Sequence, residues 1–245
     1  MGHIITDLKE TFRRGNIFIQ LIYINVSIFI IGTLINVFLQ LFQHSIPDIF
    51  GIFALPASFI RFFHQPWSII TYMFMHGGFS HIFFNMFAVF MFGTVLERTW
   101  GPKRFLFYYI VCGIGAGLIQ EGVQYIKYVV DYSHYSQVDI GTGIIPMGDF
   151  LNMLTTVGAS GAVYAILLAF GMLFPNNQLF IFPLPFPIKA KYFVIGYALI
   201  ELYAGFANNP GDNVAHFAHL GGMIFGFILI MYWRKKSRNN GTYYS

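Results

Sequence analysis

Long apolar stretches separated by short polar breaks dominate the hydrophobic pattern of the chain. Six are long enough to cross a bilayer as helices, which takes about 20 residues with some latitude. They cover 17–42, 80–98, 104–125, 157–174, 190–208 and 214–233. The second to sixth also carry polar residues, which predicts a bundle that hides these groups from lipid. We therefore expect an all-α membrane protein with six transmembrane helices at 17–233, a short segment before it at 1–16 and a basic tail at 234–245.

Two of the predicted connections are unusual. Residues 43–79 are too apolar for an ordinary solvated loop, yet several prolines and glycines interrupt them. This mixture favours a segment lying in the membrane interface between the first two spans. Residues 126–156 are more polar and predict a flexible outer loop.

Composition supports a membrane protein. Hydrophobic residues make up 56% of the chain and charged residues 10%, against about 45–50% and about 25% in soluble domains. The single cysteine, Cys112, excludes a disulfide framework within the chain. Residues 1–16 carry several charges and no apolar core, so we expect no cleaved signal peptide.

The distribution of basic residues predicts the orientation. With six spans and the amino terminus inside, every Lys and Arg except Arg61 and Lys127 falls on the inner side, where such residues accumulate. The outer loops then hold Asp48, Asp131, Asp139, Asp149 and Asp212. Both termini are therefore expected in the cytoplasm, and the net positive charge reflects topology rather than nucleic-acid binding.

Polar residues gather near the outer ends of three predicted spans. The stretch HGGFSHIFFNMF contains His76, His81 and Asn85, and the last two are four residues apart on one helical face. Polar groups at membrane depth suggest function when they converge. The alternative is that they hydrogen-bond neighbouring helices and only stabilise packing.

A serine opens the fourth predicted span. In TTVGASGAVYAIL, Ser160 lies among Gly158, Ala159 and Gly161, whose small side chains would let a substrate or another helix approach closely. Small residues of this kind also mediate helix packing in membranes, which is the alternative for Ser160 taken alone.

Two histidines lie near the start of the sixth span, in NVAHFAHLGGMIFGF. His219, Gly222 and Gly226 share one helical stripe, so a helix packed against the glycines would bring its outer end to His219. If that helix is the fourth, His219 reaches Ser160. A serine nucleophile needs such a base, and it needs donors for an oxyanion. The combination predicts a serine hydrolase that works inside the membrane.

The chain resembles the rhomboid intramembrane serine proteases over about residues 60–232. The matching stretches are HGGFSHIFFNMF, ERTWG, GASGAVYA and AHLGG followed by Gly226, in the family's order. The resemblance implies that Ser160 is the nucleophile and His219 the general base. It also implies an oxyanion hole of His81, Asn85 and the Ser160 backbone amide, and a Tyr164 ring packed on the catalytic histidine.

The resemblance also separates His219 from His216, because only Ala218-His219 is followed by glycines at the family's offsets, Gly222 and Gly226. His216 is expected to be an outer neighbour that tunes hydration. The chain departs from relatives that carry a Trp-Arg pair in the outer segment, since Ser68 follows Trp67 here.

Two acidic residues remain to be assigned. Glu97 and Arg98 match the family's pair at the inner end of the second span, where we expect a structural network. Glu201 lies in the middle of the fifth span, and we expect it to hydrogen-bond within the bundle or to anchor a helix that the resemblance makes a candidate gate. Trp67 is a second candidate for such a structural or gating role.

The expected reaction is hydrolysis of peptide bonds in or next to transmembrane segments of substrate proteins, near the outer face. No aspartate is evidently placed to orient His219, so we expect a Ser-His dyad that uses no cofactor or metal. By analogy the setting is a bacterial inner membrane. The pair Gly113 and Gly117 could pack within the bundle or between chains, so the oligomeric state stays open.

Two other functions remain possible at this point. One is a metal-dependent membrane protein that uses His76, His81, His216 and His219, although the H-E-x-x-H motif is absent. The other is a non-catalytic rhomboid-like protein that binds transmembrane helices. Such relatives usually lack the serine or the histidine, and this chain has both.

Overall fold

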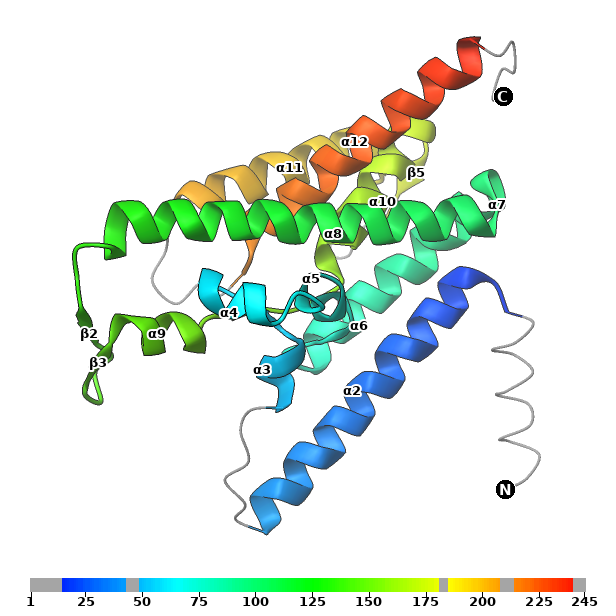
Figure 1. Cartoon of the computed structure of the whole chain (residues 1–245). Helices are drawn as coiled ribbons and strands as arrows, with labels where there is room; N and C mark the ends of the chain where they lie inside the picture. The colour runs from blue at the N-terminus through cyan, green and yellow to red at the C-terminus, as the bar shows by residue number, and fades with distance from the viewer. Residues whose placement is uncertain (1–14, 43–48, 181–184, 208–213, 240–245) are drawn as a thin grey trace.

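The computed structural model describes residues 15–42, 49–180, 185–207 and 214–239, and within these ranges the chain is mainly helical (Figure 1). Four helices are long and apolar enough to cross a membrane: Ile17–Leu41, Phe79–Trp100, Pro102–Tyr132 and His216–Asn239. They correspond to the first, second, third and sixth predicted spans. Most of residues 1–16 and the end of the predicted tail lie outside the described residues.

Within the described ranges, six long helices or helical segments form the body of the molecule. A wider, π-helical turn of a kind often found at functional positions lies within the second predicted span (η2), and another (η3) follows the end of the third. The segments are α2 (Ile17–Leu41), α6 (Phe79–Ala88) continued by η2 (Val89–Gly93) and α7 (Thr94–Trp100), α8 (Pro102–Lys127) continued by η3 (Tyr128–Tyr132), α10 (Ser160–Leu173), α11 (Ala190–Ala207) and α12 (His216–Asn239).

The fourth and fifth predicted spans are shorter than the other four. Helix α10 has 14 residues, or about 21 Å, and α11 has 18. Helix α10 begins only at Ser160 because Gly158 has a φ of +127°, which no helix accommodates. Six membrane crossings therefore remain a prediction for this chain, because among the described residues four helices meet the length and hydropathy expected of a span.

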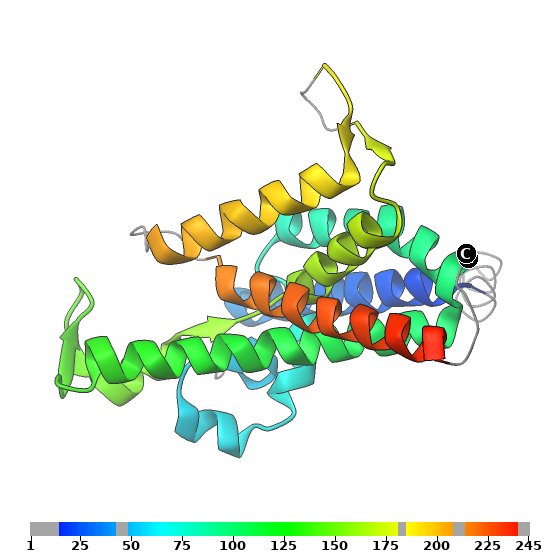
Figure 2. The same cartoon turned by 90° about the horizontal axis from the view of Figure 1, so that it is seen from above.

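Helix α10 lies at the centre of the bundle. It contacts α8, α11, α12 and the α6–η2 segment, while α2 packs on the outside of α6 and η2. Figure 2 shows α12 between α8 and α11, with the first residues of α10 close to those of α12. The arrangement places the amino-terminal ends of α10 and α12 next to each other.

Glycines allow the central helices to approach closely. A Cβ atom on Gly222 would lie 1.9 Å from the carbonyl oxygen of Gly161, and one on Gly226 would lie 2.3 Å from the Tyr108 hydroxyl. Gly113 and Gly117 of α8 instead receive side chains of residues 69–73 from the same chain. In this structure both glycine pairs therefore serve packing inside the bundle.

The segment after α2 folds into short helices. These are α3 (Ile49–Phe53), α4 (Phe59–His64), α5 (Ser68–Thr71) and a 3-10 turn, η1 (Tyr72–Phe74). Of these, α5 contacts α8. Strand β1 (Leu55–Pro56) pairs antiparallel with β4 (Thr155–Thr156), with Leu55 opposite Thr156. The pairing with β1 thus fixes the chain at Thr155–Thr156, shortly before Ser160.

Arg61 holds this segment together. Its guanidinium donates hydrogen bonds to the carbonyl oxygens of Asn152 and Gly51, both at 2.6 Å, and to the Gln65 side chain at 3.3 Å. Trp67 donates from Nε1 to the Ile52 carbonyl at 2.9 Å. Arg61 thus ties the outer segment to the chain before α10.

The connection at 126–156 is more ordered than the sequence suggests. Helix α8 and η3 extend to Tyr132, and strands β2 (Gln137–Asp139) and β3 (Ile144–Pro146) form a hairpin followed by α9 (Met147–Met153). The hairpin turn is stabilised because Asp139 accepts a hydrogen bond from the Gly141 amide at 2.8 Å and Gly141 takes a positive φ. A third pair, β5 (Gln178–Leu179) with β6 (Ile188–Lys189), lies between α10 and α11.

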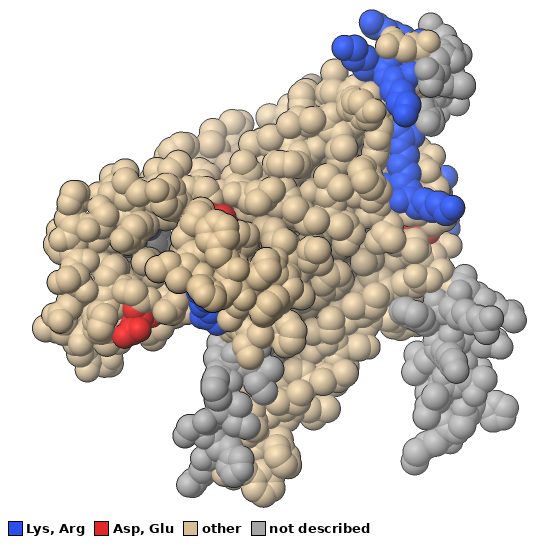
Figure 3. All heavy atoms as spheres, in the orientation of Figure 1, with Lys and Arg blue, Asp and Glu red and all other residues tan. Residues whose placement is uncertain are grey.

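Basic residues gather at one end of the molecule (Figure 3), over the end of α12 and the neighbouring start of α8. There Arg104 stacks on the Trp233 ring at 4.0 Å. Glu97 also lies at this end and accepts hydrogen bonds from the amides of Ile17 and Phe18, each at 2.9 Å, so it caps α2. Helix α12 runs to Asn239, so the predicted basic tail begins inside a helix.

Candidate active site

Ser160 is the first residue of α10, and its position is set by the turn before it. The Gly158 amide donates to the Tyr72 carbonyl at 2.9 Å, and the positive φ of Gly158 turns the chain into the helix. The amide groups of the first helical turn have no partner within the helix and lie at the positive end of its dipole. Ser160 therefore combines a hydroxyl with backbone donors suited to an anion.

The side chain of His219 reaches Ser160 from α12. Its Nε2 lies 2.8 Å from Ser160 Oγ, within hydrogen-bond distance, and the residue is buried. The two helices come this close because Gly161 and Gly222 leave no side chain between their backbones. The structure thus brings together the serine and the histidine that the sequence places 59 residues apart.

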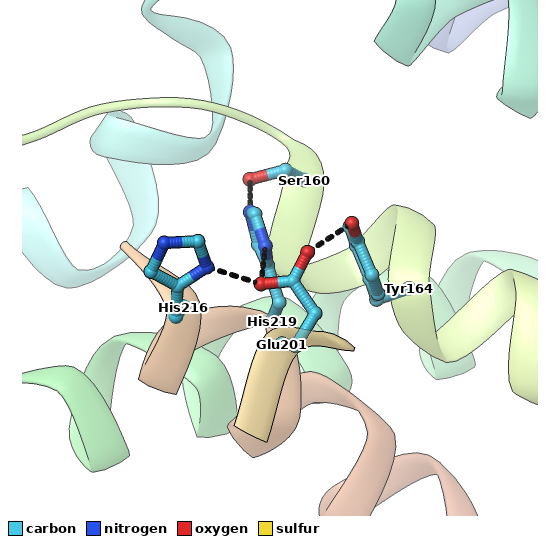
Figure 4. A network of polar contacts seen from close by, with 5 residues as sticks. All are labelled: Ser160, Tyr164, Glu201, His216 and His219. Atoms are coloured by element: carbon cyan, nitrogen blue, oxygen red, sulfur yellow. Dashed lines mark hydrogen bonds and ion pairs between the residues drawn. The ribbon is translucent and has the colours of Figure 1, made fainter. Parts of the chain in front are cut away.

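A carboxylate from a third helix contacts the same histidine (Figure 4). Glu201 of α11 directs Oε2 to His219 Nδ1 at 2.9 Å and to His216 Nδ1 at 2.6 Å, and its Oε1 accepts a hydrogen bond from the Tyr164 hydroxyl. The acidic side chain that contacts His219 is thus a glutamate of the neighbouring helix and not an aspartate. The sequence-based expectation of a Ser-His dyad did not include this contact.

The contacts of Glu201 decide which nitrogen of His219 carries the proton. An ionised carboxylate can only accept hydrogen bonds, so each imidazole donates its Nδ1–H to it. In neutral His219 the Nε2 atom is then left unprotonated and can accept the Ser160 hydroxyl proton. The Tyr164 ring stacks on the His219 ring, with centroids 4.2 Å apart and planes 7° apart, which fixes its plane.

His81 approaches Ser160 from α6, on the side where Gly158 lacks a side chain. A Cβ atom on Gly158 would lie 2.6 Å from His81 Nε2 and 3.6 Å from Ser160 Oγ, so these two atoms border the same small space. The Gly77 amide donates to His81 Nδ1 at 3.4 Å. In the neutral ring the proton is then on Nε2, which points a donor at that space.

Asn85 lies one helical turn beyond His81 and is buried. Its Nδ2 donates to the His81 carbonyl at 2.9 Å. A side-chain amide has two N–H groups, so a second donor remains. The His81 and Asn85 side chains extend from the same helical face, as their spacing predicts.

His76 is buried beside this group, with its ring centroid 5.1 Å from that of His81. It precedes α6, outside the long helices. Burial, with a smaller effect from the neighbouring His81, lowers the pKa of His76 to about 4. His76 is therefore neutral near pH 7 and lies behind His81 rather than at Ser160.

One group of side chains in the described part of the chain could hold a metal ion. Glu201, His216 and His219 each offer a ligand atom, and these atoms lie within 4.8 Å of one another. The group differs from the set of four histidines considered from the sequence, because it includes neither His76 nor His81. His219 belongs both to this group and to the hydrogen-bonded pair with Ser160.

The structure separates the remaining predicted residues from this site. Trp67 is half exposed and bonds to Ile52 in the outer segment, whereas Gly222 and Gly226 form the contact surface of α12. The contact that sequence reasoning missed is between Glu201 and His219. A glutamate in the middle of an apolar helix was its only signal, and the sequence does not tell which side chain such a residue faces.

Comparison with known proteins covers most of the chain. A family profile described as the Rhomboid domain matches residues 64–236. YdcA of Bacillus subtilis (strain 168) is 29% identical over 165 residues, which cover 66% of this chain and 65% of YdcA. Rhomboid protease AarA of Providencia stuartii is 30% identical over 167 residues, or 66% and 54% of the two chains.

A plant protein matches the same proportion of this chain. Rhomboid-like protein 16, chloroplastic, of Arabidopsis thaliana is 26% identical over 163 residues, which cover 66% of this chain and 47% of that protein. The match to each of these relatives thus spans less than two thirds of the relative's own length.

Proposed function

Since this chain belongs to the rhomboid family, we propose that it is an intramembrane serine protease that hydrolyses peptide bonds in or next to transmembrane segments of other membrane proteins. One of its relatives, AarA of Providencia stuartii, is named as a rhomboid protease. The observation that carries the proposal is the 2.8 Å contact between Ser160 Oγ and His219 Nε2. A hydroxyl becomes a nucleophile when a base lies within hydrogen-bond distance of it.

In the proposed reaction, Ser160 Oγ attacks the scissile carbonyl carbon while His219 Nε2 takes the hydroxyl proton. The carbonyl oxygen becomes an oxyanion. Collapse of this intermediate breaks the C–N bond, and His219 returns the proton to the leaving amine. Water then attacks the acyl-enzyme with His219 again as base, which releases the second product and restores the Ser160 hydroxyl.

We assign the oxyanion to the space between His81 and Ser160. His81 Nε2–H, the second N–H of Asn85 and the Ser160 amide supply its donors, and removal of one such donor typically costs about 10²- to 10³-fold in kcat. Support comes from the two atoms that border the space at Gly158, His81 Nε2 and Ser160 Oγ. Gly158 keeps this space open, whereas Gly161 allows the close contact of α10 with α8 and α12.

The substrate class follows from the position of the site among apolar helices. A substrate helix hides its carbonyl groups in internal hydrogen bonds, so the cleaved segment must unwind, and residues of low helix propensity should mark favoured sites. We place the protein as a multi-pass protein in a bacterial inner membrane, with both termini in the cytoplasm and the active site near the outer face. Nucleic acid and cofactors have no part in this proposal.

A direct test is labelling by a fluorophosphonate, which reacts with activated serines. We expect the purified protein to be labelled at Ser160 and to cleave a model transmembrane substrate. Ser160→Ala should abolish both activities, and His219→Ala should reduce both by about 10³-fold or more. Full cleavage by Ser160→Ala would overturn the proposal.

A second candidate function is a non-catalytic rhomboid-like protein that binds transmembrane helices. The similarity to rhomboid-like protein 16 leaves this function open. Such a protein would bind the model substrate but would show no labelling of Ser160. Because Glu201, His216 and His219 could hold a metal ion, metal-dependent hydrolysis is a further alternative. Activity that is abolished by a chelator and restored by zinc would favour it.

A further inference from the structure

Helix α11 places a single buried side chain in its outer half, and that side chain is a glutamate. The buried residues of α11 are Ala190, Val194 and Glu201, of which the first two belong to its inner half. Burial of a carboxylate costs several kcal/mol unless hydrogen bonds and charge partners compensate for it. The contacts of Glu201 must therefore account for its place in the bundle.

Two contacts of Glu201 are enough to anchor α11 to its neighbours. The Tyr164 hydroxyl bonds to Oε1 from α10, and His216 Nδ1 lies 2.6 Å from Oε2 on α12. The third contact, from Oε2 to His219 Nδ1 at 2.9 Å, adds no new helix to this network. It joins the carboxylate to the ring atom opposite the one that faces Ser160.

We infer that Glu201 is a positioning residue for the proposed reaction, completing a Ser160–His219–Glu201 triad across three helices. Its carboxylate holds the His219 proton on Nδ1, keeps Nε2 directed at Ser160, and stabilises the imidazolium that forms as the hydroxyl proton is taken. This inference rests on the proposed function. It assigns to α11 a part in the chemistry beyond covering the site.

The test compares three glutamate variants in detergent micelles. Glu201→Gln keeps the size of the side chain and removes its charge, while Glu201→Asp keeps the charge and withdraws it by one methylene. Glu97→Gln is the matched control, because Glu97 is equally buried, at 5% exposure, and caps α2 far from Ser160. For each variant we would measure kcat and KM for a transmembrane substrate, the rate of Ser160 labelling, and Tm.

For a positioning residue we expect Glu201→Gln to lower kcat and the labelling rate by about 10²- to 10⁴-fold, with KM within about threefold of the wild type. The kcat of Glu201→Asp should be at least tenfold higher than that of Glu201→Gln. Glu97→Gln should lower Tm but leave kcat per folded molecule unchanged. His216→Phe, which removes another hydrogen bond from the same carboxylate, should lower Tm with a kcat change of less than about threefold.

If Glu201→Gln retains wild-type kcat, or if His216→Phe loses as much kcat as Glu201→Gln, Glu201 acts only as an anchor and the inference is wrong. If Glu201→Gln does not fold, Glu201→Ala decides, because wild-type kcat per folded molecule in that variant, which has no carboxylate, would overturn the inference. Failure of the proposed function is distinguishable, since either the wild type would then show neither cleavage nor labelling of Ser160, or Ser160→Ala would still cleave the substrate.

Discussion

His76 shows how burial sets the chemistry of a single residue next to the site. It has the histidine pKa of about 6.5 in an unfolded chain, whereas burial beside His81 lowers the pKa to about 4 in the folded protein. The unfolded state therefore binds this proton first as the pH falls. The contribution of neutral His76 to the free energy of unfolding is therefore fully present above about pH 6.5 and is lost progressively as the pH falls to about 4.

We accordingly expect the wild type to lose on the order of 3 kcal/mol of unfolding free energy through His76 between these two pH values. His76→Phe, which keeps a ring and removes the ionisable nitrogens, should flatten this part of the pH profile. The measurement is unfolding in micelles at several pH values, with His64→Phe as control because His64 is exposed. Identical slopes for His76→Phe and the wild type would contradict the prediction.

Between elements, the contact of α10 with α12 determines whether Ser160 and His219 meet. A methyl group on Gly222 would lie 1.9 Å from the backbone oxygen of Gly161, an atom that cannot rotate away. The two helices would have to separate, and the 2.8 Å contact between Ser160 and His219 would lengthen with them.

We expect Gly222→Ala to destabilise the protein by about 1–3 kcal/mol and to lower kcat by about 10²-fold, the loss typical of a misplacement of about 1 Å. Gly122→Ala is the matched control, because a Cβ atom there meets nothing within 4 Å. Helix propensity should make this control neutral or more stable by up to about 1 kcal/mol. Tm and kcat measured for both variants check the prediction, and equal effects would contradict it.

At the scale of the whole molecule, the charges define two ends. Lys and Arg side chains gather at one end of the molecule (Figure 3), where α7 ends, α8 begins and α12 ends. Arg61 lies in α4, among the short helices of the outer segment. The β2–β3 hairpin with Asp139 lies at the other end of α8. This separation agrees with the predicted orientation, in which the basic end faces the cytoplasm.

Reporter fusions would test that orientation in bacterial cells. Alkaline phosphatase, which is active only outside the cytoplasm, should be active when inserted after Gly141 and inactive when fused after Lys236. A green fluorescent protein fusion after Lys236 should fluoresce. Active phosphatase at Lys236 would mean that the basic end faces outward, which contradicts the predicted topology.

The sequence by itself determined the helical membrane class, the approximate helix positions, and the stretches that carry Ser160, His219, His81 and Asn85. These features could be predicted because apolar length, helical spacing and the placement of glycine, serine and histidine are local properties of the chain. The boundaries were less accurate, since α8 with η3 and α12 both continue beyond their predicted ends. Helices continue through polar residues when the flanking backbone hydrogen bonds persist.

Only the tertiary structure decided which polar residues meet. The local sequence around Arg61 and Glu201 does not indicate which residues they contact. The expected Ser-His dyad therefore left out Glu201, which reaches His219 from another helix. Rotation of α11 about its axis sets that contact, and the packing of the whole bundle sets this rotation. The sequence therefore located the chemical groups, while the packing of α10, α11 and α12 arranged them around one imidazole ring.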